Sequence, residues 1–267
     1  MNSLYSAYYS LKPVVYTFIL ELKLQFKKFI IFSGMIFFLI FLVEYLGPLI
    51  GQPLDSIIDF YKHGIDYLLI TLVLAVSIFF GGIICSEYKN KTGLTIVPLV
   101  NRYKLILGKY LANVVLVSGT TSVFYLTITL FAYNFYGGPL LNTVPYSFGL
   151  ALLYALALSS IAIFLSSCLP SISTVILTMV GYFIVIDVII FSFIFGTSGE
   201  IEPLYSFSYL FQIISYILYP NFSTMARRDE FTDQWLFPSI EGALILLSLY
   251  IILFFILGIL LFKYRKF

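Results

Sequence analysis

Charged side chains are scarce in this chain of 267 residues, of which they make up 10%. An ordinary soluble domain contains about 25%. Hydrophobic residues make up 61% of the chain, and its mean hydropathy is +1.02. A soluble globule of this size could not bury so much apolar surface, so the composition predicts an integral membrane protein and excludes a disordered chain or a small disulfide-stapled domain. The net charge of +2 argues against nucleic acid as a partner.

Histidine, cysteine and the motifs of common catalytic sites are also lacking. The single histidine, His63, cannot supply an H-E-x-x-H metal site, and the sequence contains neither a G-x-S-x-G nucleophile motif nor a G-x-x-x-x-G-K-[ST] phosphate-binding loop. We therefore expect no catalytic residue, metal or cofactor in the chain itself. The two cysteines, Cys85 and Cys168, fall near predicted cytoplasmic ends of spans, where we expect small buried thiols rather than a disulfide.

Six apolar stretches are each long enough to cross a bilayer. A hydrocarbon core about 30 Å thick requires roughly 20 apolar residues of helix, at about 1.5 Å per residue. Because backbone polar groups in lipid must be satisfied within the segment, all six are predicted to be helices. The predicted spans cover residues 29–47, 66–85, 105–133, 146–168, 172–195 and 240–262. The third is longer than one bilayer, so we expect it to tilt or to project into the cytoplasm.

A moderately amphipathic helix is predicted over residues 11–26, ahead of the first span. Apolar side chains recur on one face at the helical spacing, and the lysines fall off that face. Pro13 is tolerable in the first turn of such a helix. The alternative is a soluble N-terminal tail. The predicted apolar face consists of Leu11, Val14, Val15, Phe18, Leu22 and Phe26.

The basic residues predict the orientation of the spans. With the N-terminus inside, 12 of the 15 Lys and Arg residues fall in inside segments, which is a strong positive-inside bias. The three outside are Lys62, Arg227 and Arg228. Six spans also return the C-terminus to the cytoplasm, where three of these 12 basic residues follow the last span. We therefore predict a single multi-pass domain in the cell (plasma) membrane, with both termini cytoplasmic.

The segment 86–104, between the second and third spans, is predicted to lie in the cytoplasm. It begins with an acidic residue and continues with several cations. The pair Thr92-Gly93 and Pro98 are expected to break regular structure. Such a segment can form a short helix lying under the membrane surface. The alternative is an ordinary basic loop that sets the topology.

This segment resembles the corresponding loop of the ABC transporter type-2 permease family. In that family a glutamate leaves the second span, and a Gly-Thr pair, a proline, an arginine and a Gly-Lys pair at the start of the third span follow it. In this chain the pair reads Thr-Gly, and it comes directly after Lys91. The matching residues are Glu87, Thr92, Gly93, Pro98, Arg102, Gly108 and Lys109.

The resemblance covers essentially the whole length of the chain, because the family also has an N-terminal elbow helix, six spans and its largest outer region between spans five and six. It implies that the residues from Glu87 to Arg102 touch a separate ATP-binding cassette subunit, which holds ATP and Mg. It further implies that two permease copies, or this chain and a paralogue, pair in the membrane lipid. The function implied is ATP-driven export, with no enzymatic activity in this chain.

The predicted outer region, residues 196–238, contains a strongly apolar and aromatic stretch over 204–219. At about sixteen residues the stretch is short for a crossing. A re-entrant or interfacial helical hairpin fits this length, since tyrosine favours the headgroup level of a bilayer. Such a hairpin could form an outer gate, or the aromatic side chains could simply form an interfacial belt.

Two acidic residues fall within predicted spans. Asp187 sits well inside the fifth, where a carboxylate should face protein or a water-filled path. It could line the export route or hydrogen-bond a neighbouring helix. As an ion carrier, it would make the chain an ion-coupled secondary transporter, the main alternative to a permease; a third is a non-transporting membrane scaffold. Glu44, near the outer end of the first span, is a second candidate for the path, unless it reaches the interface.

Overall fold

The computed structural model describes residues 2–46, 56–85, 102–138, 141–196, 202–229 and 235–264. Within these ranges the chain is helical and has no named strand. One isolated bridge pairs Arg228 with Trp235. The prediction of an all-α protein is therefore confirmed for the described part of the chain.

Six helices among the described residues are long and apolar enough to cross a membrane, which confirms the number of predicted spans. They are built from α1 (Asn2–Ile40) with the π-helix η1 (Phe41–Leu46), α3 (Ile57–Asp66) with α4 (Leu68–Phe80), α7 (Arg102–Tyr136), α8 (Val144–Cys168), α9 (Ile172–Val180) with the π-helix η2 (Gly181–Ile186) and α10 (Asp187–Gly196), and α12 (Ile240–Tyr264). The short helices α11 (Phe207–Tyr216) and η3 (Phe222–Thr224) lie between the fifth and sixth.

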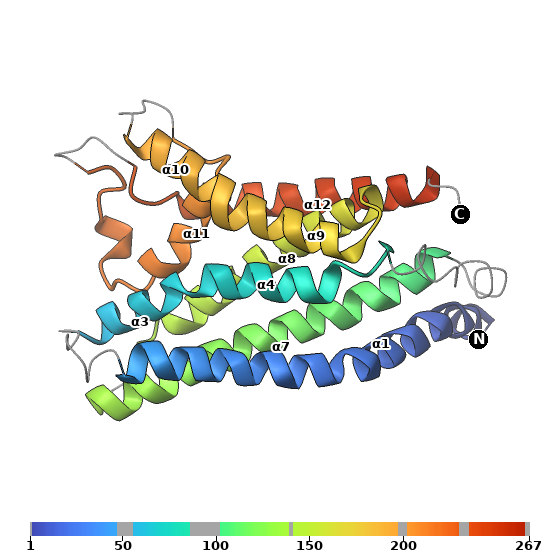
Figure 1. Cartoon of the computed structure of the whole chain (residues 1–267), viewed down its shortest axis with the longest axis horizontal. Coiled ribbons are helices and arrows are strands. Elements are labelled where there is room, and N and C mark those ends of the chain that lie inside the picture. The colour runs from blue at the N-terminus through green and yellow to red at the C-terminus, as the bar shows by residue number, and fades with distance from the viewer. Residues whose placement is uncertain are drawn as a thin grey trace.

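The first two spans differ from the prediction in extent. The predicted amphipathic helix over 11–26 and the span from residue 29 form one continuous helix, α1. Pro13 lies inside α1, and the first turns of this helix bend away from the bundle axis (Figure 1), as a proline within a helix permits. The second span begins at Ile57 rather than at residue 66, because α3 and α4 follow one another directly across Tyr67.

The face that α1 buries also differs in part from the predicted apolar face. Val14 is buried as expected, but Leu11, Val15 and Phe26 are exposed. The buried side of α1 includes Glu21, which is 8% exposed. Residues 11–26 are helical, as part of the longer helix α1, and the face that they bury depends on packing against another helix.

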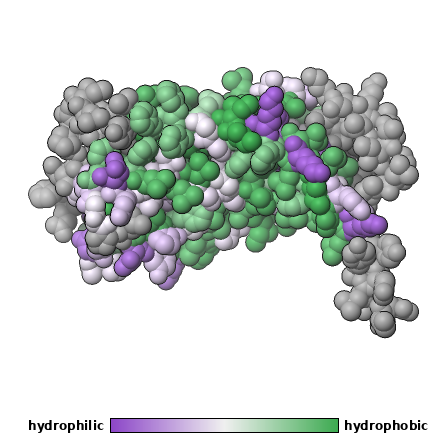
Figure 2. Space-filling view, turned by 90° about the horizontal axis from the view of Figure 1, so that it is seen from below, coloured by the Kyte–Doolittle hydropathy of each residue, from purple (hydrophilic) through white to green (hydrophobic). Residues whose placement is uncertain are grey.

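The described helices lie side by side in a bundle whose centre is formed by α4 and α8 (Figure 1). In the most apolar stretch of α8, 61% of residues are buried, compared with 11% in α12 and 17% in α1. The peripheral helices thus turn apolar side chains outward. Figure 2 shows apolar residues across the middle of one face and hydrophilic residues toward its two ends, which is the distribution expected of a protein embedded in lipid.

The two ends of the bundle differ in the elements that meet there. The start of α1, the end of α4, the start of α7 and the end of α12 gather at one end, here called the termini end (Figure 1). The opposite end holds α3, α11 and the end of α7, and is here called the α11 end. Most lysines on the described helices lie on the half of the bundle nearer the termini end, and Lys62 on α3 is the exception among the described lysines. The others are Lys12, Lys23, Lys27, Lys28, Lys104, Lys109 and Lys263. Acidic residues lie toward the α11 end, at Asp59, Asp66, Glu202, Asp229 and Glu241.

Candidate functional site

Helix α11 runs beside α8 in the opposite direction. Three hydrogen bonds from α8 side chains fix which residues of the two helices lie opposite one another. Thr143 Oγ1 donates to the carbonyl of Leu218 at 3.1 Å, and Ser147 Oγ donates to the carbonyl of Ile214 at 2.7 Å. The hydroxyl of Tyr154 donates to the carbonyl of Phe207 at 3.3 Å. Thr143 and Tyr154 are eleven positions apart, which is about 16 Å along a helix. The N-terminus of α11 therefore lies about 16 Å inside the bundle, measured from the first turn of α8.

The carboxylate of Asp187 caps this buried N-terminus. Asp187 is 2% exposed. Its Oδ1 accepts a hydrogen bond from the N–H of Phe207 at 3.2 Å, and its Oδ2 accepts one from the N–H of Ser208 at 2.6 Å. The N–H of Tyr209 donates to Oγ of Ser206, and the N–H of Ser206, the N-cap residue, donates to the carbonyl of Pro203. A helix leaves its first four N–H groups without partners, and here all four are bonded.

These contacts give Asp187 a structural role. A helix N-terminus carries the equivalent of about half a positive elementary charge and stabilises an anion placed against it. Both carboxylate oxygens accept hydrogen bonds, as they do in the ionised form. The cost of burying a charge inside the fifth span is thus offset by α11, an element that reaches this depth from the neighbouring segment of the chain.

A pocket of about 300 Å³ lies beside this cap. Its walls come from α8, from α9 with η2, from α12, and from the residues where the chain enters α11. Phe207, whose N–H binds Asp187, is one of the lining residues, and Tyr182 and Phe183 line the pocket from the π-helix η2. Single π-helical turns within helices are frequent at functional sites. The pocket and the capped N-terminus therefore form one candidate site, joined at Phe207.

A second feature is a close approach of α1 to α7 at Gly108, in the second turn of α7. A Cβ atom at Gly108 would lie 2.7 Å from the carbonyl oxygen of Val14 and 2.8 Å from Cβ of Thr17. Further along, a Cβ atom at Gly119 would lie 3.0 Å from the ring of Phe29. These two contacts show that α1 and α7 run in parallel, and that only glycine fits the first of them.

The end of α4 is held against α8 by Ser166. Its Oγ accepts hydrogen bonds from the N–H groups of Ile84 at 3.1 Å and Cys85 at 3.2 Å, and donates to the carbonyl of Gly81 at 3.2 Å. Ser166 and Cys85 are both buried. One hydroxyl group therefore fixes the backbone turn that follows α4, immediately before residues 86–101.

We expect Ser166→Ala to lower the free energy of unfolding by about 1–3 kcal/mol, because it leaves buried N–H groups without an acceptor. Ser159 provides a matched control, since it is equally buried but donates to the carbonyl of Ala155 in its own helix at 2.7 Å. Ser159→Ala should cost less than about 1 kcal/mol. Thermal unfolding of the purified protein in detergent measures both. Equal losses in the two variants would contradict the role given to Ser166.

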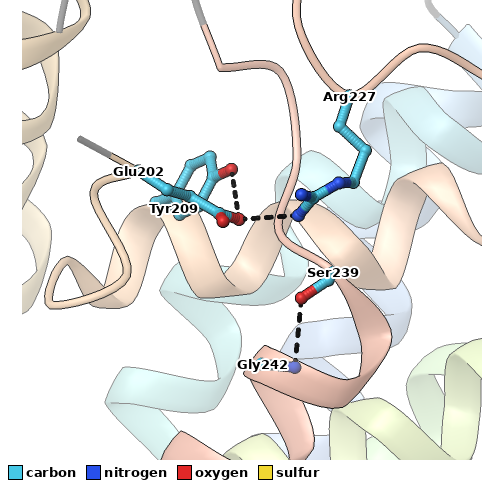
Figure 3. Close-up of polar contacts among 5 residues, drawn as sticks. All are labelled: Glu202, Tyr209, Arg227, Ser239 and Gly242. Carbon is cyan, nitrogen blue, oxygen red and sulfur yellow. Dashed lines mark hydrogen bonds and ion pairs between the residues drawn. The ribbon is translucent and has the colours of Figure 1, made fainter. Parts of the chain in front are cut away.

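A polar cluster at the α11 end joins the segments that precede α11 and α12 (Figure 3). Glu202 Oε1 accepts a hydrogen bond from the hydroxyl of Tyr209 at 3.1 Å and pairs with Nη1 of Arg227 at 3.1 Å. Burial raises the pKa of the Tyr209 hydroxyl, and the Glu202 carboxylate raises it further, so the hydroxyl stays protonated and donates. Ser239 Oγ accepts from the N–H of Gly242 at 3.1 Å in the first turn of α12.

Several predicted site residues lie outside the described part of the chain. Glu87, Lys91, Thr92, Gly93 and Pro98 all fall within residues 86–101, so their predicted contact with an ATP-binding subunit stays a prediction.

The other predicted residues fall on separate elements. Arg102 is the first residue of α7, and Gly108 and Lys109 follow in the same helix. Glu44 lies in η1, on a different span from Asp187. Among the described residues, Arg102, Glu44 and Asp187 thus lie on three different spans.

The predictions for the cysteines hold in part. Both are free thiols, and Cys85 is buried, but Cys168 is exposed. Cys168 is the last residue of α8, where the helix ends and packing against neighbours stops. A thiol at that position is not the small buried residue that we expected.

The partners of Asp187 were not identified from the sequence. A weak signal was present, because Ser206 lies near the start of the apolar stretch 204–219, and serine favours the N-cap position of a helix. Nothing in the sequence, however, places that N-terminus beside the fifth span. The hydrogen bonds from Phe207 and Ser208 depend on the depth of α11, which only the folded chain reveals.

Comparisons with known proteins give no further assignment: no protein-family model matches the chain, and no curated protein matches it. Within the described residues, no group of three or more His, Cys, Asp or Glu side chains could hold a metal ion.

Proposed function

We propose that this chain is the transmembrane permease subunit of an ATP-driven exporter, powered by a separate ATP-binding cassette subunit that carries ATP and Mg. The observation that carries this proposal is the close approach at Gly108. It joins the base of α7, which directly follows the proposed coupling segment 86–101, to the N-terminal part of α1.

The contact at Gly108 provides a mechanical route for coupling. In this proposal, ATP hydrolysis in the partner moves the coupling segment, and the segment moves the first turns of α7. Because the backbone of α1 at Val14 touches α7 with no side chain between them, α1 follows. The N-terminal part of α1, which bends from the bundle axis (Figure 1), corresponds to the elbow helix of the family that the sequence resembles.

The distribution of charge supports the proposed orientation. Most of the described lysines lie toward the termini end and most of the described acidic residues toward the α11 end, which fits a cytoplasmic termini end and an outer α11 end, in line with the positive-inside rule. The proposed location is the plasma membrane, with lipid around the peripheral helices. A second copy, or a paralogue, completes the transporter.

The depth of α11 supports a re-entrant element between spans five and six. In the proposed orientation, α11 begins about 16 Å below the outer end of α8 and returns to that end. Asp187 holds its N-terminus in place. A segment anchored in this way could act as the outer gate of the export path.

The alternative of an ion-coupled transporter with Asp187 as carrier is less well supported. Both oxygens of its carboxylate already accept backbone hydrogen bonds, which favours an anchor over a group that must release and rebind an ion. No described feature favours a non-transporting scaffold.

Charge reversal in the coupling segment tests the proposal. We expect Glu87→Lys and Arg102→Glu each to weaken the association with the ATP-binding subunit about tenfold or more, because an interfacial charge then faces a partner group of like sign. The measurement is co-purification of the two subunits, with ATP hydrolysis as the second readout.

Glu241→Lys is the matched control for Glu87→Lys. Glu241 is an exposed glutamate at the α11 end, far from the proposed interface, and its reversal should leave both readouts unchanged. Unchanged association in the Glu87 and Arg102 variants would show that the coupling segment has been assigned wrongly.

A further inference from the structure

The pocket beside Asp187 has walls made largely of aromatic rings. Seven of its ten lining residues are Phe or Tyr. Six of these rings form an unbroken series of contacts, with centroids 5.0 Å apart for Tyr182–Phe183, 5.1 Å for Phe183–Phe207, 4.8 Å for Phe207–Tyr250, 6.1 Å for Tyr250–Phe254 and 5.4 Å for Phe254–Phe164. The pocket therefore has a wall of aromatic rings that contact one another.

The pocket opens toward the periphery of the bundle. Tyr182 is 42% exposed and Tyr205 is 55% exposed, whereas Phe183 and Phe207 at the back of the pocket are buried. The fifth and sixth spans, which carry Tyr182 and Tyr250, are among the least buried of the six. A molecule dissolved in the bilayer can therefore enter from the side. The volume, about 300 Å³, is at the lower end of the range of about 300–1,000 Å³ that small-molecule sites occupy.

The charge around the pocket has one sign. No Lys or Arg is among the lining residues, and the described lysine on α12, Lys263, is nine positions beyond Phe254, about 14 Å along the helix. The Asp187 carboxylate lies behind the wall, where it accepts a hydrogen bond from the N–H of Phe207. The N-terminus of α11 offsets only about half of that negative charge.

We propose that this pocket binds a planar or compact aromatic cation taken up laterally from the membrane. Aromatic faces attract cations through their quadrupole, most strongly where water is excluded. The carboxylate behind the rings adds to the attraction, and an anionic ligand would meet no positive partner in the wall. The pocket becomes a cargo site only if the proposed export function also holds, but the binding itself needs neither ATP nor a partner subunit.

The test is equilibrium binding of N-methylquinolinium to the purified full chain in lipid nanodiscs, compared with its uncharged isostere methylnaphthalene. We expect saturable binding of the cation. Tyr182→Leu and Tyr205→Leu keep an apolar side chain but remove a ring from the mouth of the pocket. Each should weaken binding of the cation roughly tenfold, and change that of methylnaphthalene less than about twofold.

Tyr146→Leu is the matched control, because Tyr146 is an exposed tyrosine in the first turn of α8 and does not line the pocket. It should leave the affinity for the cation unchanged. The proposal is overturned if the cation does not bind saturably, if it binds the Tyr182 and Tyr205 variants as tightly as the unmodified chain, or if both probes lose affinity equally. Any of these results leaves the association with an ATP-binding subunit untouched, so failure of this proposal and failure of the proposed function are distinguishable.

Discussion

Asp187→Ala should lower the free energy of unfolding by about 3–5 kcal/mol. The change leaves the N–H groups of Phe207 and Ser208 without acceptors in a buried site, and each unpaired donor costs about 1–3 kcal/mol. It also removes the anion that the N-terminus of α11 stabilises. Thermal unfolding in detergent, followed by far-UV circular dichroism, measures the loss.

Asp187→Asn separates hydrogen bonding from charge at the same site. The amide oxygen can still accept one backbone hydrogen bond, but the amide nitrogen faces the second N–H group and cannot accept from it. We expect Asp187→Asn to lower the free energy of unfolding by about 2 kcal/mol, less than the decrease expected for Asp187→Ala. Asp59→Asn, at an exposed carboxylate in the first turn of α3, should cost less than about 1 kcal/mol. If Asp187→Asn were as stable as the unmodified chain, Asp187 would not be the anchor of α11.

Gly108→Val should lower the free energy of unfolding by about 3 kcal/mol and disturb the contact between α1 and α7. Its Cβ would collide with the carbonyl oxygen of Val14, 2.7 Å away, and with Cβ of Thr17, 2.8 Å away. One of these atoms belongs to the backbone, so α1 itself must move, and inserting volume into a packed contact typically costs about 1–3 kcal/mol. The substitution should also reduce ATP hydrolysis stimulated through the coupling segment, if that function holds.

Gly149→Ala is the control for the Gly108 variant. Gly149 lies within α8, and a Cβ atom there would meet nothing within 4 Å. Because glycine is about 0.5–1 kcal/mol less favourable than alanine in a helix, Gly149→Ala should stabilise the protein slightly. A Gly108→Val variant as stable as the unmodified chain would mean that α1 and α7 do not touch at this point.

The course of the membrane-crossing helices could be predicted from the sequence because hydropathy and helix length act locally. Predicted spans four and six agree with α8 and α12 to within two residues at either end. The predicted N-terminal helix continues into span one within α1, because no helix-breaking residue lies between residues 26 and 29. The second span begins nine residues earlier than predicted. Its first helix, α3, contains polar residues, and a prediction from hydropathy alone leaves them out of the span.

The contacts of the candidate site could not be predicted, because they join residues that are distant along the chain. The sequence indicated Asp187 as a deep charge in need of a partner, and it indicated Gly108 through its resemblance to a family motif. It did not indicate that α11 would descend to cap Asp187, or that Val14 would lie against Gly108. Both contacts depend on how whole helices pack against one another, and the periodicity of residues within a single segment does not determine that packing.

The most direct test of the proposed function is the ATP hydrolysis of the complex that a tagged copy of this chain brings with it from its own membrane. The proposal predicts a complex with a protein that contains a G-x-x-x-x-G-K-[ST] loop, in equal amounts, and Mg-dependent hydrolysis of ATP by that complex. If the chain purified without any nucleotide-binding protein and the preparation hydrolysed no ATP, it would not be the permease of an ATP-driven exporter.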